Sequence, residues 1–442
     1  MSSLFKNLAT KISSASHYSI EGKVCGVKGM LIEAKGLNSF VSVGSVCCII
    51  NSNAEHIKSE VVGFRDKVAL LLPFGEITGI GAGSRVLLQS TAQTIYPSDG
   101  WRGRIINCFG VPIDDKGPLP LGDEPYLIKA SPPKASERTR VKDKLDLGVR
   151  AVNMFTTCCK GQRLGVFAGS GVGKSVLLSM FTKFACADIK VIGLIGERGR
   201  EVNEFIEDYL GPEGLKDAIV IVATSDESAL ARRQAAYVTM AVSEYFRDQN
   251  KEVLTMIDSI TRFAMALREI GLASGEPPTS KGYTPSVFAE LPKILERAGP
   301  GVKGKGTITG IFSTLVEGDD NNEPIADAVR SILDGHIVLS RDIATRGRFP
   351  SIDVLHSISR MMPQCNNDEQ NSIVSCARKH LANYNEVSDL IRIGAYKAGA
   401  DPEIDKSIKL FPDIEKFLSQ GPNEQDDINS TYIKLANIVQ KN

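Results

Sequence analysis

The sequence lacks an excess of charge of either sign and lacks any segment suited to a membrane. Its 442 residues contain 52 Lys and Arg and 52 Asp and Glu, so no net field favours nucleic acid or an anionic bilayer. No apolar run reaches the roughly 18–20 residues that a membrane-spanning helix needs. The N-terminus has no continuous apolar core of signal-peptide length. We therefore expect a cytoplasmic protein.

The sequence also lacks the cysteine spacing of a structural metal site. None of its nine cysteines forms a Cys-x-x-Cys pair, which argues against zinc, although Cys47-Cys48 and Cys158-Cys159 are adjacent. In a reducing cytoplasm such residues are usually free thiols. We expect most of them to serve as small apolar side chains inside the protein.

Residues 20–95 have the pattern of a small β-barrel domain. Short β-branched runs are separated there by Gly, Asn and Asp, which is typical of strands joined by tight turns. The runs are Phe40–Val43, Val46–Ile50 and Val86–Leu88. A turn-rich connector with several prolines begins at Tyr96.

Residues 96–362, which include this connector, predict a wound α/β domain, because strands and helices alternate from about residue 150. Short, continuously apolar runs indicate strands buried on both faces of a parallel sheet. They are Arg163–Phe167, Val191–Ile195, Ala218–Val222 and Val253–Ile257. Residues 363–442 have apolar residues at helical intervals and predict a helical domain, with breaks at Pro402 and Pro412.

A glycine-rich segment after the first of these runs is the chemical centre of the sequence. Between a strand and a helix, such a loop directs backbone N–H groups and the positive end of the helix dipole at one point, which suits a phosphate. Lys174 can reach the outer phosphates and the Ser175 hydroxyl can bind Mg²⁺. Ala168 replaces the first glycine of the strict motif, and its methyl group is tolerable if its φ stays negative. The loop consists of Ala168, Gly169, Ser170, Gly171, Val172, Gly173, Lys174 and Ser175.

Two acidic residues follow other apolar runs. Asp258 ends the run Val253–Ile257, at the sheet edge where ligands bind, and can hold Mg²⁺. Glu197 follows Val191–Ile195 and can polarise an attacking water molecule. The simpler alternatives are a helix N-cap for Asp258 and a solvated Glu-Arg turn for Glu197.

Together these motifs resemble the rotary ATP synthase α/β family. The resemblance covers about residues 20–420 and implies a β-barrel, a RecA-like P-loop domain and a helical C-terminal domain. It rests on Gly103–Gly117, Ala168–Ser175, Gly196–Glu201, Ile257–Arg262 and His356–Arg360. Other segments are similar to the ATPases of flagellar and type III protein export, namely Gly275–Ala289, Val316–Asp327, Asp389–Tyr396 and Gly399–Asp405.

The resemblance assigns roles to individual residues. It places Lys174 at the β- and γ-phosphates, and Ser175 and Asp258 at the metal. Glu197 would orient or deprotonate the hydrolytic water, and Arg198 and Arg262 would steady the γ-phosphate. The implied substrate is ATP, with Mg²⁺ as the cofactor.

Two further residues acquire a role only through the resemblance. Arg360 matches an arginine that the family inserts into a neighbouring subunit's site, where it offsets transition-state charge. Because one chain carries both Glu197 and Arg360, it can supply every site of a homohexamer. Phe349 stands where the family usually has a tyrosine that stacks on adenine, and its ring keeps the stacking face. The alternatives are an inter-helix salt bridge for Arg360 and core packing for Phe349.

The resemblance also implies partners and a location at the inner-membrane export apparatus. Residues 1–19 form an amphipathic segment that suits a stator-like regulatory subunit, with folding onto the barrel or lipid contact as alternatives. Its apolar face consists of Leu4, Phe5, Leu8 and Ile12. The loop Gly275–Ala289 would line a central channel as a lever or as a rigid interface. Further implied partners are a central-stalk-like coiled-coil protein, export gate membrane proteins and export chaperone–substrate complexes.

Three classes of function remain in competition. The favoured one is a ring-shaped ATP hydrolase that energises flagellar protein export, with an injectisome ATPase as the alternative. A synthase-like rotary subunit is disfavoured, because the acidic segment near the end of a synthase β subunit is absent. An RNA-translocating hexamer would need a barrel rich in basic and aromatic residues, and residues 20–95 are not. We expect no nucleic-acid partner.

Overall fold

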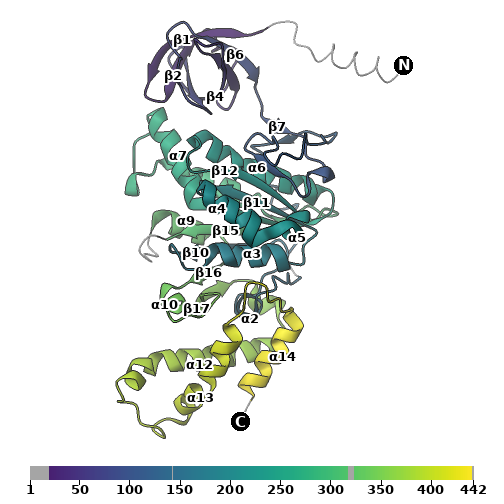
Figure 1. Ribbon diagram of the computed structural model, residues 1–442, viewed down its shortest axis with the longest axis vertical. Coiled ribbons are helices and arrows are strands. Elements are labelled where there is room, and N and C mark those ends of the chain that lie inside the picture. The colour runs from purple at the N-terminus through teal and green to yellow at the C-terminus, as the bar shows by residue number, and fades with distance from the viewer. Residues whose placement is uncertain (1–18, 142, 317–322, 441–442) are drawn as a thin grey trace, which may run out of the picture.

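The computed structural model describes residues 19–141, 143–316 and 323–440. A barrel, a sheet domain and a helical end are stacked along the long axis of the molecule (Figure 1). The predicted docking segment lies outside the described residues except for Ser19. The predicted domain boundaries, at 95/96 and 362/363, stay a prediction. No helix in the described ranges has both the length and the apolar character needed to cross a bilayer.

The first strands close into a barrel in the order β1-β2-β5-β4-β3-β6, and β1 completes the ring by pairing with β6. Alternate residues point inward because successive strand side chains face opposite sides. Val24, Ile32, Ile49 and Leu71 are among those that form the barrel core. The strands are β1 (Glu21–Lys28), β2 (Leu31–Lys35), β3 (Val46–Ile50), β4 (His56–Arg65), β5 (Val68–Pro73) and β6 (Arg85–Ser90).

One predicted barrel strand, Phe40–Val43, is wrong. The Phe40 N–H donates to the Leu37 carbonyl at 2.9 Å, so the chain turns there instead of joining a ladder. The side chains of Phe40 and Val43 are 56% and 63% exposed. Gly44, with φ of 94°, then leads the chain into β3, a conformation that glycine adopts without steric cost.

A largely parallel sheet in the order β17-β16-β10-β15-β13-β11-β12-β8 forms the central domain. Its strands are buried on both faces, as predicted: Ile192 and Leu194 of β11 join one hydrophobic cluster, and Val191 and Ile195 join the other. The strands are β8 (Ile105–Asn107), β10 (Arg163–Ala168), β11 (Ile189–Ile195), β12 (Ala218–Ala223), β13 (Glu252–Asp258), β15 (Thr307–Leu315), β16 (Gly335–Leu339) and β17 (Ile352–Ser359). The short strand β14 (Gly299–Pro300) pairs with β15, and β7 (Thr94–Ile95) pairs with β9 (Tyr126–Leu127).

Helices cover both faces of this sheet (Figure 1). Most begin where a strand has just ended, so the carboxyl ends of the parallel strands meet the helix N-termini along one edge. The helices are α2 (Arg150–Phe155), α3 (Lys174–Phe184), α4 (Gly199–Glu204), α5 (Gly211–Lys216), α6 (Ala229–Asp248), α7 (Ile260–Ser274), α8 (Pro285–Leu295), α9 (Pro324–Ile332) and α10 (Arg341–Thr345). A π-helical turn, η2 (Phe205–Leu210), joins α4 to α5, and the 3₁₀ turns are η1 (Asp99–Trp101) and η3 (Ser280–Gly282).

The C-terminal part is helical, as predicted, and consists of α11 (Met362–Cys365), α12 (Asp368–Arg392), α13 (Pro402–Leu418) and α14 (Ile428–Val439). Pro402 lies in the first turn of α13, where its missing N–H costs nothing. The predicted break at Pro412 is wrong, because α13 continues through it to Leu418. Arg150 of α2 fixes this part to the sheet domain by donating to the Phe417 carbonyl at 2.8 Å.

A buried ion cluster joins the barrel to the sheet domain. Glu60 of β4 is 1% exposed and accepts hydrogen bonds from Arg233 of α6 and, at 3.0 Å, from Lys129. The charges of Arg233 and Lys129 outweigh the effect of burial and hold the pKa of Glu60 below its ordinary value. Removing Glu60 would leave Arg233, whose side chain is 7% exposed, charged and buried without its partner.

We expect Glu60→Leu to lower the free energy of unfolding by ~3 kcal/mol, because Arg233 keeps its charge in a buried site. Urea denaturation followed by circular dichroism measures this change. Glu21→Leu is the matched control, since it breaks a solvent-exposed barrel pair with Arg85 and should change the stability far less. Equal losses in the two variants would contradict a structural role for the buried cluster.

Candidate active site

The predicted phosphate loop lies between β10 and α3. Gly171 and Gly173 have φ of 77° and 93°, which other residues rarely adopt, and this curves the loop around the N-terminus of α3. Ala168 is the last residue of β10 and pairs with Leu315 and Leu339 in the ladders to β15 and β16. Its φ is not positive, so the departure from the strict glycine motif costs no strain, as expected.

Lys174 lies between two carboxylates at the start of α3. Its Nζ atom contacts Asp258 Oδ1 and lies 3.4 Å from Glu197 Oε1. Asp258 ends β13, and Glu197 lies two residues beyond β11, which is the neighbouring parallel strand. The three side chains are 11%, 5% and 13% exposed, respectively. The sheet topology therefore collects one buried cation and two anions at the mouth of the loop.

The structure disagrees with the two simpler alternatives, a helix N-cap for Asp258 and a solvated turn for Glu197. Ser259, not Asp258, caps α7, by accepting a hydrogen bond from the Arg262 N–H. Asp258 instead accepts a hydrogen bond of 2.6 Å from the Ser313 hydroxyl of β15. Glu197 is largely buried and is not a solvated turn residue.

Burial and the neighbouring charge of Asp258 raise the pKa of Glu197 to about 7, against the opposing effect of Lys174. Burial by itself would lower the pKa of Lys174, but the charges of Asp258 and Glu197 outweigh burial and raise it. Lys174 therefore stays protonated, while Glu197 is poised to exchange a proton near neutral pH.

A cleft of about 970 Å³ opens above this cluster. It is lined by every predicted loop residue except Val172, which is buried in the core, and by Glu197, Arg198 and Arg262. Arg262 packs across Gly196, where an added Cβ would lie 2.9 Å from the arginine Cβ. Arg198 is mostly exposed and lies 3.7 Å from Glu201.

Sequence reasoning missed several side chains of the cleft. Arg341, at the start of α10, donates to the Ser170 carbonyl of the loop at 3.5 Å. It follows β16, a neighbour of β10, so the rule that ligands bind at strand ends could have found it. Lys281 and Tyr283 of the predicted channel loop also line the cleft. The further lining residues are Val176, Glu201, Tyr209, Thr261, Met265, Arg268, Leu315, Val316 and Glu323.

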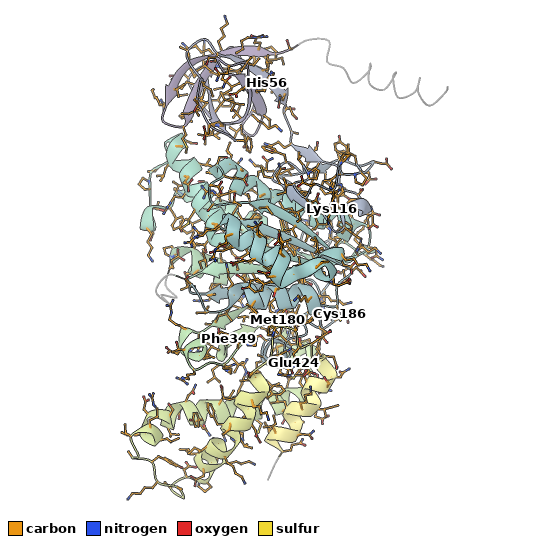
Figure 2. The ribbon with its side chains drawn as sticks, viewed as in Figure 1. His56, Lys116, Met180, Cys186, Phe349 and Glu424 are labelled. Carbon is orange, nitrogen blue, oxygen red and sulfur yellow. The ribbon has the colours of Figure 1, made fainter. Side chains whose placement is uncertain are left out.

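Phe349 lies beside the phosphate loop. Its side chain is 47% exposed, and a Cβ placed on Gly173 would lie 3.5 Å from its Cδ1 atom. Figure 2 shows it between the sheet domain and the C-terminal helices, in the segment that joins α10 to β17. Phe349 is therefore not a core residue, and it lies next to the loop without being among the residues that line the cleft.

Arg360 does not line the cleft of its own chain. It directly follows β17, an edge strand of the sheet, and its side chain is exposed. Its backbone N–H donates to the Asp334 carbonyl at 2.9 Å. The preceding Ser359 donates to the Thr157 carbonyl at 2.8 Å and accepts from Gln162 Nε2 at 2.9 Å. A fixed backbone thus presents this guanidinium to the outside.

The fold and cleft define a P-loop nucleotide-binding protein. Residues 148–359 match the model of the ATP synthase alpha/beta family, nucleotide-binding domain, and residues 366–437 match that of the T3SS EscN ATPase C-terminal domain. The chain is 55% identical over 440 residues to the flagellum-specific ATP synthase of Caulobacter vibrioides, covering 98% of this chain and 99% of that protein. It belongs to the flagellar and type III secretion ATPases of the ATP synthase α/β family.

Solved structures agree with this membership. The assembled ATPase EscN from the enteropathogenic E. coli type III secretion system superimposes with a TM-score of 0.88 and 42% identity, over 95% of this chain and all of EscN. EscN in complex with its central stalk EscO gives a TM-score of 0.87 and 41% identity over the same shares. The predicted order of β-barrel, P-loop domain and helical end is confirmed.

Replacing Phe349 by alanine should weaken ATP binding by on the order of tenfold, because stacking of a base on an aromatic ring is worth ~1–3 kcal/mol. Titration of the protein with a fluorescent ATP analogue measures the dissociation constant. Phe349→Tyr should bind like the parent chain, since it keeps the ring face. Wild-type affinity in Phe349→Ala would contradict contact with the adenine.

Proposed function

We propose that this chain hydrolyses ATP to energise the export of flagellar proteins through a type III secretion apparatus. One observation carries the proposal: a buried lysine at the phosphate loop is held by two carboxylates from adjacent parallel strands. The family supplies the reaction class. A role in flagellar export is supported by sequence identity, which is 55% to the flagellum-specific ATP synthase of Caulobacter vibrioides and 42% to EscN.

The loop and Lys174 bind the triphosphate. Backbone N–H groups of the loop and the dipole of α3 face the cleft, and Lys174 gives its charge to the outer phosphates. Incoming phosphate oxygens replace Asp258 and Glu197 as partners of the ammonium group. Arg198 and Arg262 line the same cleft and steady the γ-phosphate.

The residues present fit a magnesium ion. Mg²⁺ prefers oxygen ligands and is usually held by one or two carboxylates, waters and substrate phosphates. The Ser175 hydroxyl lines the cleft, and the Asp258 carboxylate, directly or through water, lies below Lys174 at the same edge. The bound ion would neutralise charge on the phosphates.

Glu197 acts on the attacking water. Its carboxylate accepts a proton as the water oxygen bonds to the γ-phosphorus, and the bond from that phosphorus to the bridging oxygen of ADP breaks. Burial keeps this carboxylate poorly solvated, which favours proton uptake. The products are ADP and inorganic phosphate.

Arg360 completes the site of a neighbouring copy. Its exposed position at the end of an edge strand, outside its own cleft, suits insertion into the cleft of the next subunit. There it offsets charge that develops in the transition state. A homohexamer closes this head-to-tail arrangement, and the assembled EscN structure supports such a ring.

The proposed partners of this chain are components of the type III secretion apparatus. A central-stalk-like coiled-coil protein is supported by the complex of EscN with its central stalk EscO. We further propose a stator-like subunit at residues 1–19, export gate membrane proteins, and export chaperone–substrate complexes at the cytoplasmic face of the inner membrane. Export in an injectisome is the second candidate, because the chain shares its fold and 42% sequence identity with EscN.

The rate should depend on the ionisation of Glu197. Its raised pKa of about 7 means that the carboxyl is protonated at lower pH and then cannot accept a proton from water. We expect kcat/KM for ATP to fall about tenfold per pH unit below this pKa and to level off above it. Steady-state assays at constant ionic strength measure the profile, with circular dichroism confirming the fold. A flat profile through the acid range would contradict Glu197 as the base.

Mixing two inactive variants should restore turnover. In rings of equal parts Glu197→Gln and Arg360→Ala, about one interface in four pairs an intact glutamate with an intact arginine, so up to about a quarter of the parent rate should return. The control mixture pairs Arg360→Ala with a Glu197→Gln/Arg360→Ala double variant and should stay inactive. No recovery in mixed rings verified by native mass spectrometry would contradict a shared site.

A further inference from the structure

A short segment lies between the phosphate loop and the C-terminal helices and carries Phe349. This joining segment consists of residues 348–351, between α10 and β17. At its end, the Ser351 hydroxyl donates to the Val172 carbonyl of the phosphate loop at 2.7 Å. In its middle, the Phe349 carbonyl accepts a hydrogen bond of 2.8 Å from the Gln420 N–H, two residues beyond α13. The joining segment is therefore bonded both to the loop and to the C-terminal part.

A buried ion pair adds a second link to α13. Arg348 Nε lies 3.1 Å from Glu415 Oε2, and Arg348 Nη2 donates to the Ile352 carbonyl at 2.9 Å. The arginine side chain is 8% exposed, and its Nη1 atom is buried without a hydrogen-bond partner among the described residues. A buried guanidinium is costly unless an anion lies beside it. Glu415 therefore fixes the place of Arg348 and, with it, of the adjoining Phe349.

Side-chain packing by itself leaves the joining segment room to move. A cavity of about 230 Å³ borders the ion pair and is lined by both of its members. Apolar side chains of β17, α12 and α13 form part of its wall, namely Leu355, Leu381 and Phe411. The Phe349 ring is half-exposed. Because close packing is what usually fixes a side chain, a segment beside a cavity and solvent depends on its hydrogen bonds and on the ion pair.

We infer that Arg348 and Glu415 are positioning residues, whose ion pair holds the Phe349 ring against the adenine of a bound nucleotide. Neither residue lines the cleft, so both act through the ring. The inference rests on the proposed ATP site, in which Phe349 stacks on adenine. The triphosphate is bound by the loop and Lys174 in that site. A change in the ion pair should therefore alter the affinity for the base and leave the affinity for the phosphates as it is.

The test compares a ligand that has a base with one that lacks it. Isothermal titration calorimetry of the full chain uses Mg²⁺ with a non-hydrolysable ATP analogue and, separately, Mg²⁺ with tripolyphosphate. Glu415→Gln keeps the shape of the side chain and removes its charge. We expect its dissociation constant for the analogue to rise about three- to tenfold, up to the loss predicted for Phe349→Ala, with tripolyphosphate binding unchanged.

Three further variants separate positioning from a general effect on stability. Arg348→Met removes the buried charge together with its need for a partner, and it should weaken binding of the analogue alone. In a Phe349→Ala background, Glu415→Gln should have no further effect, because the ring through which it acts is gone. Glu403→Gln is the matched control on the same helix, since Glu403 forms an exposed ion pair of 2.7 Å with Lys379, and it should change neither dissociation constant. Circular dichroism confirms that each variant is folded.

The outcomes distinguish the inference from the proposed function. Unchanged affinity of Glu415→Gln for the analogue overturns the inference, as does an equal loss for the analogue and tripolyphosphate. Additive losses in the Phe349→Ala/Glu415→Gln double variant also overturn it, because the ion pair would then act elsewhere than on the ring. Unchanged affinity of Phe349→Ala alone contradicts the adenine contact and the inference together. A parent chain without ATP hydrolysis contradicts the proposed function instead, and the two titrations still decide whether the ion pair acts on the base.

Discussion

The ion triplet of Lys174, Asp258 and Glu197 is the interaction on which the site depends. A buried ammonium group is costly unless anions balance it, and here they come from the ends of two adjacent strands. The same positive charge is what a triphosphate needs. On the proposed function, nucleotide binding would exchange one set of anionic partners for another and would free Glu197 to act on water beside the γ-phosphate.

The sheet order makes this triplet possible. β10, which leads into the phosphate loop, is separated from β13 by β15, and Ser313 of β15 holds Asp258 from that side. β11 next to β13 then brings Glu197 to the same edge. The opposite side of the sheet ends in β17, whose exposed C-terminal end carries Arg360. One chain therefore holds a cleft and, outside it, the exposed arginine that we propose enters the cleft of the next copy.

Features that depend on neighbouring residues in the sequence could be predicted, whereas features that depend on contacts between distant segments could not. The phosphate loop and the strand ending in Asp258 follow from glycine spacing and continuous apolar runs. The run Phe40–Val43 was predicted to be a strand because β-propensity alone does not show whether a partner strand is available. Pro412 was predicted to end a helix, yet the burial of Leu410, Ile414 and Phe417 offsets the cost of a proline inside α13. Lys281 reaches the cleft from a segment that only the folded chain brings there.

A structure of the assembled ring with Mg²⁺ and a non-hydrolysable ATP analogue measures the exchange of partners directly. Lys174 Nζ should have left both carboxylates for the β- and γ-phosphate oxygens, with the guanidinium of a neighbouring copy's Arg360 within hydrogen-bonding distance of the same γ-phosphate. If Lys174 keeps its contacts with Asp258 and Glu197 while the analogue is bound, or if that guanidinium stays in solvent in a closed ring, the site is not built as described.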